Sequence, residues 1–385
     1  MLDHVSTRRV FLRRGMTLLA VGATIPSFLD QTVMALASPD DLKRTQQPSG
    51  KDGKILVVVQ MSGGNDGLNT IIPYADDVYH SARSNIAHDP STVLKLDSYI
   101  GLHPNLGPLR DLLDKGMMSI VQGVGYPNPN RSHFRAMDIW QSAVPEKEIV
   151  TSGWLGRYFD NSCPGCDPHV GVAIGETSPL AMRGEKVMPL SFDRPENYRY
   201  NGPDKQRYSA LNQNNDPLPS PHSPDNTPII TPGEQLNFLT RTAMDAQVSS
   251  DDILRITRGY GASGYPGSEF GNGLKTVAAM IKGQLPTRVY YVALGGFDTH
   301  AGERGRHDQL MQQLAQGIGA FWKDMKEQGN DQRVLMMTFS EFGRRVASNA
   351  SGGTDHGAAA PMMLFGPACK QAIVGAHPSL NDLDQ

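Results

Sequence analysis

The 385-residue sequence has few cysteines, no excess of basic charge and no long apolar run, and each absence excludes a class of protein. Its three cysteines are too few for a small scaffold held by disulfides. The formal net charge is −3 and no basic run lies beyond the amino terminus, so we expect no nucleic-acid partner. The hydrophobic fraction of 39% is still enough for one large α/β domain or two smaller ones.

The amino terminus has the three parts of a signal peptide. Paired arginines in Arg8-Arg9-Val10-Phe11-Leu12 precede an uncharged stretch, residues 15–29, and the small-residue segment Ala35-Leu36-Ala37. The arginine pair followed by Phe-Leu resembles the twin-arginine signal, so we expect the twin-arginine export machinery to be a partner. We predict cleavage after Ala37, a linker over residues 38–53, and a periplasmic or extracellular protein.

A retained membrane anchor is the alternative interpretation of this amino terminus. Residues 15–29 are too short for it, since spanning a bilayer takes about 20 apolar residues. We therefore expect no stable membrane span after cleavage.

Five apolar runs predict strands that alternate with helices. The strands are expected at residues 54–61, 117–124, 289–294, 333–339 and 361–365, and the helices at 132–143, 235–246, 274–282 and 307–328. The first runs are so continuously apolar that both faces of each strand must be buried. This alternation predicts a doubly wound α/β fold with a mostly parallel central sheet and helices on both faces. We assign residues 54–385 to one domain with a polar insertion around residues 197–231, and truncation at the carboxyl end is an alternative that the sequence leaves open.

Polar side chains follow three of these predicted strands. Asn65 and Asp66 follow the first, Asp298 and His300 follow the strand at 289–294, and Glu341 follows the strand at 333–339. A fourth cluster contains His356 and precedes the last apolar run. Each Asp alone is more often a helix cap or a turn residue. Carboxylates gathered in one crevice, however, need cations, so together they predict one or two divalent ions, Zn²⁺, Mn²⁺ or Mg²⁺.

The strand at 117–124 is followed by a different segment, in which Arg131, Ser132 and His133 come just before an expected helix. Ser132 has the position of an ordinary N-cap. The same position places a hydroxyl at a helix amino terminus, where it could attack phosphorus while backbone N–H groups hold the oxyanion. Arg131 would then contact phosphate, and His133 would be a general acid or base or simply a surface histidine.

Five motifs in order resemble those of the bacterial family named domain of unknown function 1501. They are Gly63-Gly64-Asn65-Asp66-Gly67-Leu68-Asn69, Asn130-Arg131-Ser132-His133-Phe134, Gly295-Gly296-Phe297-Asp298-Thr299-His300, Ser340-Glu341-Phe342-Gly343-Arg344-Arg345 and Gly353-Thr354-Asp355-His356-Gly357. That family looks distantly related to the alkaline phosphatase and sulfatase superfamily, whose members use one or two metals and a Ser, Thr or formylglycine nucleophile. The resemblance implies an alkaline-phosphatase-like fold.

The resemblance also implies roles for single residues. Ser132 looks like the nucleophile, and we add His133 as a catalytic candidate from its place in the same segment. The implied metal ligands are Asp66, Asp298, His300, Glu341 and His356. Arg131, Arg344 and Asn65 are assigned to binding the anion. Phe342 stands where the superfamily usually has a histidine, which makes a second metal site poorer in nitrogen ligands.

The leading hypothesis is an exported metal-dependent hydrolase of phosphate or sulfate esters, acting on a small-molecule ester. The alternative from another class is a catalytically silent envelope protein that keeps the fold as a binding or scaffold module. A third hypothesis keeps the metal but lets hydroxide attack in place of Ser132. The sequence does not narrow the substrate further.

Overall fold

The computed structural model describes residues 53–145, 149–162, 168–175, 177–185, 187–198 and 250–383. The predicted signal peptide, nearly all of the predicted linker, the predicted helix at 235–246 and all but the start of the predicted insertion lie outside these residues. Of the helices in the described ranges, none combines the length and apolar character needed to cross a bilayer.

The core of the fold is an eight-stranded sheet whose strands are, in spatial order, β13 (Ile373–Val374), β5 (Met118–Val124), β12 (Ala360–Phe365), β9 (Val334–Phe339), β1 (Ile55–Ser62), β8 (Val289–Gly295), β6 (Gly171–Ile174) and β7 (Leu190–Phe192). Neighbouring strands are parallel except where β12 pairs with β5 and β9. The mostly parallel sheet predicted from the sequence is therefore confirmed, with β12 as its one reversed strand in the described part of the chain.

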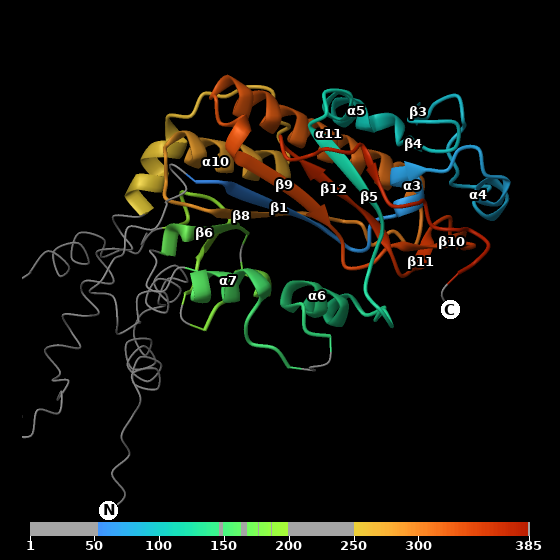
Figure 1. Ribbon diagram of the computed structural model, residues 1–385, viewed down its shortest axis with the longest axis horizontal. Helices are drawn as coiled ribbons and strands as arrows, with labels where there is room; N and C mark the ends of the chain where they lie inside the picture. The colour runs from blue at the N-terminus through green and yellow to red at the C-terminus, as the bar shows by residue number, and fades with distance from the viewer. Residues whose placement is uncertain are drawn as a thin grey trace, which may run out of the picture.

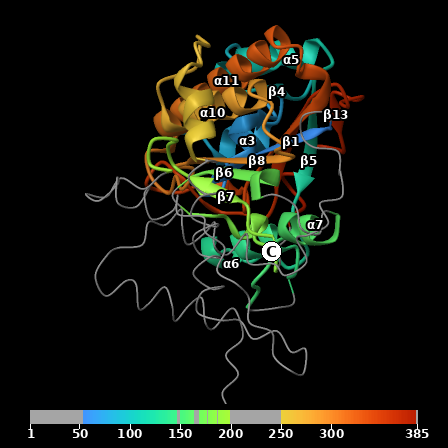
Figure 2. The same ribbon diagram turned by 90° about the vertical axis from the view of Figure 1, so that its left-hand side faces the viewer.

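Helices cover both faces of this sheet (Figures 1 and 2). One face carries α5 (Gly107–Asp114), α10 (Glu269–Lys282) and α11 (Glu303–Glu327), and the other carries α6 (His133–Ser142) and α7 (Trp154–Ser162). Val57 and Val59 of β1 pack into the core on the α10–α11 side, whereas Val58 packs into the core on the α7 side. Burial on both faces explains the continuous apolar run of β1.

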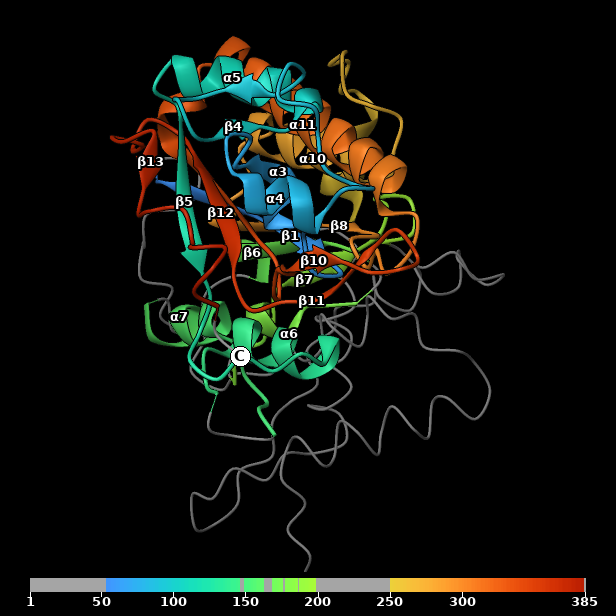
Figure 3. The same cartoon turned by 90° about the vertical axis from the view of Figure 1, so that its right-hand side faces the viewer.

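Smaller elements surround one end of the sheet. They are α3 (Gly67–Thr70), α4 (Asp77–Ala82), the strands β2 (Ile71–Ile72), β3 (Leu94–Lys95) and β4 (Gly101–Leu102), the 3₁₀ turn η1 (Pro104–Leu106), and the antiparallel hairpin β10 (Arg344–Ser348) and β11 (Thr354–His356). Three more 3₁₀ turns adjoin the strands: η2 (Pro168–Val170) precedes β6, η3 (Leu180–Met182) lies between β6 and β7, and η4 (Asp331–Arg333) precedes β9. Figure 3 shows the hairpin beside the end of β1, with α6 directly below it.

The predicted bounds agree with the structure to within one residue at each end for β1, β5, β8, β9, β12 and α6. Helix α10 begins at Glu269, earlier than predicted, because Ser268 caps it by accepting a hydrogen bond from the Gly271 N–H at 3.2 Å. The sequence does not predict β6, β7 or α7. These elements are short, and short runs give little periodicity to detect.

Candidate functional site

The predicted site segments meet at one edge of the sheet because of the strand directions. Since β1, β8 and β9 are parallel, their carboxyl ends and the residues that follow them lie at the same edge. Strand β12 runs the opposite way, so its amino-terminal end, with His356 four residues before it, reaches that edge too. The topology thus gathers motifs that are almost 300 residues apart in the sequence.

Two glycines after β1 let the chain turn at this edge. Gly63 has φ +121° and Gly64 has φ +81°, a region of backbone space that favours glycine. A Cβ on Gly63 would lie 2.3 Å from the Asp298 backbone N, and one on Gly64 would lie 2.4 Å from the Phe342 ring. The glycine pair therefore allows the loop after β1 to pack directly against the loops after β8 and β9.

Three histidines surround one oxygen of Asp298. From Asp298 Oδ1 the distance to His300 Nε2 is 3.2 Å, and the distances to His133 Nε2 and His356 Nε2 are both 3.4 Å. His300 Nε2 and His356 Nε2 lie 2.9 Å apart. Ligands of a tetrahedral zinc ion, each about 2.0–2.1 Å from the metal, lie about 3.3 Å from one another. Ligand atoms of His133, Asp298 and His356 all lie within 4.8 Å of one another, which is close enough to share a metal ion, and His300 lies beside Asp298 and His356.

The other ring nitrogen of each histidine is held by an oxygen acceptor. His133 Nδ1 lies 3.0 Å from Glu341 Oε1, His300 Nδ1 lies 3.2 Å from Asp355 Oδ1, and His356 Nδ1 lies 2.7 Å from the Arg131 carbonyl oxygen. An Nδ1–H that donates to oxygen leaves Nε2 as the free lone pair, which is how metal-bound histidines are usually oriented. All three rings are thus set to present Nε2 toward Asp298.

The charge states at this cluster also suit a cation. Burial lowers the pKa of His356 below its ordinary value of 6.5, so its ring is neutral at pH 7. For Asp298, burial acts to raise the pKa, but hydrogen bonds from Arg344 and His356 outweigh it and lower the pKa below 3.8. A neutral imidazole and an ionised carboxylate are the forms that bind metals.

Arg344 was predicted to bind an anion, but its guanidinium makes hydrogen bonds within the protein. Its side chain is fully buried, and its Nη2 donates to Asp298 Oδ1 at 2.9 Å. It also donates to the backbone carbonyls of Gly63, Gly64, Phe297 and Thr354. Since these acceptors occupy the guanidinium, Arg344 fixes Asp298 in place and joins the loops after β1, β8 and β9.

Glu341, predicted to be a metal ligand, lies one step behind the cluster. Its side chain is 3% exposed, and its Oε1 accepts from the Gly63 N–H at 2.8 Å as well as from His133. Glu341 therefore contacts the cluster through His133.

Ser132 and Arg131 flank the cluster at the start of α6. Ser132 is exposed, and within the described residues its hydroxyl makes no capping hydrogen bond to α6. The Arg131 carbonyl accepts from His356, and the Arg131 side chain is exposed. In the sequence, the predicted nucleophile thus lies between His133, a member of the histidine cluster, and Arg131, whose carbonyl contacts another member.

Asp66, also predicted to be a metal ligand, lies inside the protein, where a guanidinium neutralises it. Its carboxylate is 0% exposed and its Oδ2 is 2.5 Å from Nη1 of Arg83, which is equally buried. Burial acts to raise the pKa of Asp66, but Arg83 and a hydrogen bond from Glu303 outweigh it and hold that pKa below its ordinary value of 3.8. Its other oxygen caps α3 by accepting from the Leu68 N–H at 3.2 Å.

Glu303 and Asn65 complete this buried group. Burial and the charge of Asp66 raise the pKa of Glu303 above its ordinary value of 4.5, so Glu303 holds a proton beside Asp66. Asn65 Oδ1 accepts from Thr70 Oγ1 at 3.0 Å and lies 3.3 Å from His307 Nε2. Asn65 is 0% exposed, so its amide lies away from any anion at the surface cluster.

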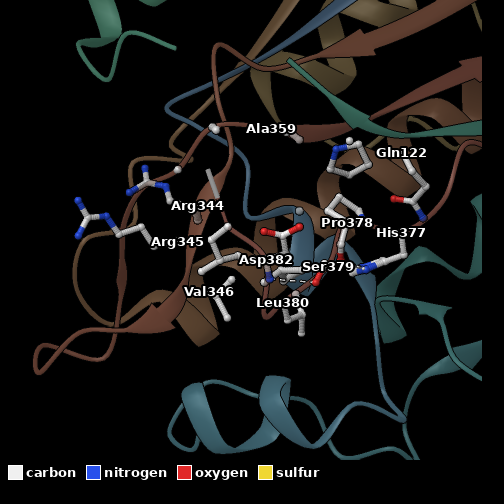
Figure 4. Close-up of a pocket in the computed structure, with 18 of the residues that line it drawn as sticks. Gln122, Arg344, Arg345, Val346, Ala359, His377, Pro378, Ser379, Leu380 and Asp382 are labelled. Carbon is white, nitrogen blue, oxygen red and sulfur yellow. Dashed lines mark hydrogen bonds between the residues drawn. The ribbon is translucent and has the colours of Figure 1, made fainter. Parts of the chain in front are cut away.

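A cavity of about 670 Å³ adjoins the site on the side of the β10–β11 hairpin. Its lining includes Arg131, Arg344, Arg345 and Gly357, together with residues 377–380, Asp382 and Leu383. Figure 4 shows Ser379 and Asp382 in the middle of the cavity wall, with Arg344 and Arg345 on one side and Gln122 and His377 on the other. Arg345 is exposed and is a cationic side chain of this wall that the sequence did not single out.

The sequence also gives no signal for Arg83 and Glu303, whose roles arise from tertiary contacts. Asp355 lies next to His356 in the motif Gly353-Thr354-Asp355-His356-Gly357, and this position is a sequence signal for its contact with His300. Arg83 ends α4 with no local pattern around it, yet it also donates to the carbonyls of Arg345 and Val346, both at 2.7 Å.

No curated protein sequence matches the chain. Among solved structures, the chain is similar to the lipoteichoic acid synthase LtaP from Listeria monocytogenes, with 9% identity, a TM-score of 0.35, and coverage of 90% of this chain and 73% of that one. A protein in the alkaline phosphatase superfamily from Vibrio parahaemolyticus has 8% identity, a TM-score of 0.35 and coverage of 92% and 72%. The zinc complex of the C-terminal periplasmic domain of EcEptC from Escherichia coli has 9% identity, a TM-score of 0.39 and coverage of 83% and 75%. At these identities and TM-scores the similarities carry no argument about function.

The family comparison is more specific. The family model described as "Protein of unknown function (DUF1501)" matches residues 115–383, which is well over half of the chain. The matched range contains Ser132 and every member of the histidine cluster, and Asp66 lies before it. The chain belongs to the DUF1501 family.

Proposed function

We propose that the protein is a metal-dependent hydrolase of phosphate or sulfate esters whose metal is held by His133, Asp298, His300 and His356. The observation that carries this proposal is the convergence of three Nε2 atoms on Asp298 Oδ1, at 3.2 to 3.4 Å. Within the described residues, His133 Nε2 is buried without a hydrogen-bond partner, an arrangement that a bound ion would satisfy.

The ligand set favours a single zinc or manganese ion. Imidazole nitrogens with one carboxylate suit these metals better than Mg²⁺, which prefers oxygen ligands. Phe342 supports one metal ion rather than two, because an apolar ring without a ligand atom packs against the histidines. The centroid of its ring lies 4.4 Å from that of the His356 ring and 4.9 Å from that of the His133 ring. The role proposed for His133 is therefore that of a ligand, in place of the acid or base expected from the sequence.

In the reaction, a divalent ion would supply Lewis-acid stabilisation of the charge that develops on the ester oxygens. The residues of the chain would do the rest. Ser132 Oγ, exposed and free of capping, would attack phosphorus or sulfur; the ester bond breaks, the group passes to the serine, and the hydroxyl proton ends on the departing alcohol. Water would then hydrolyse the esterified serine and release phosphate or sulfate. The first N–H groups of α6 lack acceptors within the helix and would hold the oxyanion.

Anion binding falls to the exposed arginines. Arg131 and Arg345 both line the adjoining cavity and both have exposed side chains, whereas the guanidinium of Arg344 is occupied by backbone carbonyls and Asp298. Arg344 and Glu341 would act by positioning Asp298 and His133.

Activity on generic aryl phosphate and sulfate esters tests this proposal. Turnover should need added Zn²⁺ or Mn²⁺ and should fall by at least about a hundredfold in Ser132→Ala and in His356→Ala. Ser81→Ala, which removes an exposed hydroxyl on α4, is the matched control and should keep full activity. Intact turnover in Ser132→Ala with loss in His356→Ala would favour attack by hydroxide. Metal binding without turnover in any variant would favour the silent binding module.

We also propose that the twin-arginine machinery exports the protein to the periplasm or beyond, on the strength of the Arg8-Arg9 pair. Cell fractionation of wild type and the Arg8→Lys, Arg9→Lys double variant tests this. Retention of the double variant in the cytoplasm supports twin-arginine export, and unchanged export contradicts it.

A further inference from the structure

A second group of metal-binding side chains lies where the segments after α4 and before η1 meet the start of α11. His88 follows α4, His103 precedes η1, and Asp308 lies near the start of α11, and one potential ligand atom from each falls within 4.8 Å of the others. Asp308 Oδ1 is 2.8 Å from His103 Nε2 and 3.8 Å from His88 Nε2. The Asp308 side chain is 34% exposed, so the group reaches solvent through it.

His88 provides the second, independent observation. Its side chain is 1% exposed, and within the described residues neither of its ring nitrogens has a hydrogen-bond partner. Burying an imidazole with both nitrogens unpaired is unfavourable, so such a ring normally has a partner such as water or an ion. Its Nε2 lies 3.8 Å from Asp308 Oδ1, and this carboxylate would attract a cation to the space beside the ring.

We propose that His88, His103 and Asp308 form a second divalent-metal site, suited to Zn²⁺, which joins the segment between α4 and η1 to α11. Two imidazoles and a carboxylate, with water in the fourth position, are a common zinc ligand set. Arg304 lies 3.4 Å from the Asp308 carboxylate, but its Nη1 donates to the carbonyls of Ile86 and Ala87. Arg304 therefore holds the segment next to His88.

One hydrogen bond to His103 would be lost when a metal binds, and its loss weakens binding only slightly. The Asn105 N–H donates to His103 Nδ1 at 3.0 Å, which places the ring proton on Nε2, where it points to Asp308. Metal binding at Nε2 needs the other tautomer and breaks this capping bond. A lost cap costs roughly fivefold in affinity, which is little against the affinity of a three-ligand zinc site.

Metal counting on the full chain tests this inference. Protein stripped with a chelator is titrated with Zn²⁺, and bound zinc is counted by mass spectrometry and calorimetry. Wild type should bind two equivalents. His88→Ala should lose one of them, and so should Asp308→Asn, a partly exposed change that preserves shape and guards against a folding defect in His88→Ala. His80→Ala, on α4 outside the group, should keep both.

The variants separate this inference from the proposed function. His356→Ala should lose the equivalent at the surface cluster and keep the one at His88. A wild type that binds one equivalent, lost in His356→Ala and kept in His88→Ala and Asp308→Asn, overturns the second site and leaves the proposed function standing. One equivalent lost in His88→Ala and kept in His356→Ala supports the second site and contradicts the first. No bound zinc in wild type overturns both.

Discussion

Two aspartates that follow neighbouring parallel strands have opposite surroundings. Asp66 comes after Gly63-Gly64 at the end of β1, and Asp298 comes after Gly295-Gly296 at the end of β8. Asp66 is 0% exposed and paired with Arg83, whereas the Asp298 side chain is 50% exposed and faces three histidines. The same local pattern therefore serves two purposes, and the partners supplied from elsewhere in the chain decide which.

The difference lies in how each negative charge is neutralised. Within the protein, Asp66 has a guanidinium and the protonated Glu303, so it needs no further cation. Asp298 has Arg344 on one side, and on the other it faces three imidazole rings, of which that of His356 is held neutral by its lowered pKa. We infer that Asp66 stabilises the fold and Asp298 binds metal, and the following changes test that contrast.

The largest effect is expected from Arg83→Met. This change leaves the Asp66 carboxylate buried without its cation and removes the bonds from Arg83 to the carbonyls of Arg345 and Val346. Breaking a buried pair in this way costs about 3–5 kcal/mol of unfolding free energy. Urea unfolding of the stripped protein measures it. The control is Arg110→Met, which breaks the exposed pair with Asp114 and should cost less than about 1 kcal/mol. Equal costs for the two changes would contradict the account.

The next largest effect is expected from Asp298→Asn, measured as zinc affinity at the surface cluster. Asp298 is the only carboxylate among the four proposed ligands, and its loss should weaken binding by on the order of a hundredfold or more. Stability without metal should change little, because Arg344 keeps its four carbonyl acceptors. Asp252→Asn, a comparable charge change at the surface, should leave affinity unaltered. A large loss of stability together with unchanged zinc affinity would mean that Asp298, like Asp66, stabilises the fold and does not bind metal.

A smaller effect is expected from Glu341→Gln, since Glu341 contacts the cluster through His133. Losing a carboxylate that orients a metal-bound histidine weakens metal binding by roughly 10- to 100-fold. Asp355→Asn is the matched change behind His300, and its effect should be smaller because Asp355 is 51% exposed. Calorimetric zinc titration checks both. A Glu341 variant that binds zinc like wild type would show that the contact does not orient His133.

The smallest effect is expected from Glu303→Gln. If Glu303 is already neutral, an amide replaces it with a change of at most about 1 kcal/mol, provided that its hydrogen bonds to Thr354 and Asp66 are kept. The pH dependence provides the sharper measurement. The native pKa lies above the ordinary 4.5, so the native state binds more protons than the unfolded state as pH rises above that value. This carboxyl therefore contributes stability that is lost as pH rises above about 4.5, so the slope of stability against pH should be more positive in Glu303→Gln than in wild type. An unchanged slope would mean that Glu303 is ionised.

Much of this site follows from the sequence. Asp298, His300 and His356 were predicted as ligands, and the parallel strands with the reversed β12 bring them together. His133 was assigned to acid–base chemistry because it adjoins Ser132, and sequence proximity does not show where the ring points. Only the fold shows its Nε2 beside Asp298.

The environment of Asp66 could not be inferred from the sequence in the same way. Its partner Arg83 is 17 residues away at the end of a short helix, and Glu303 begins α11 with no motif that ties it to Asp66. A Gly-Gly turn followed by Asp predicts a presented carboxylate in both places. Whether that carboxylate is exposed or is buried beside a cation depends on the tertiary structure. The residues next to it in a loop do not show which of the two will occur.

The most direct test of the central claim is an anomalous-difference map, at the zinc absorption edge, from crystals of the zinc-loaded protein. The account predicts a strong peak within bonding distance of Asp298 Oδ1 and the Nε2 atoms of His133, His300 and His356, and no peak beside Asp66. A peak on the Asp66 carboxylate, or no zinc among the three histidines, would contradict it.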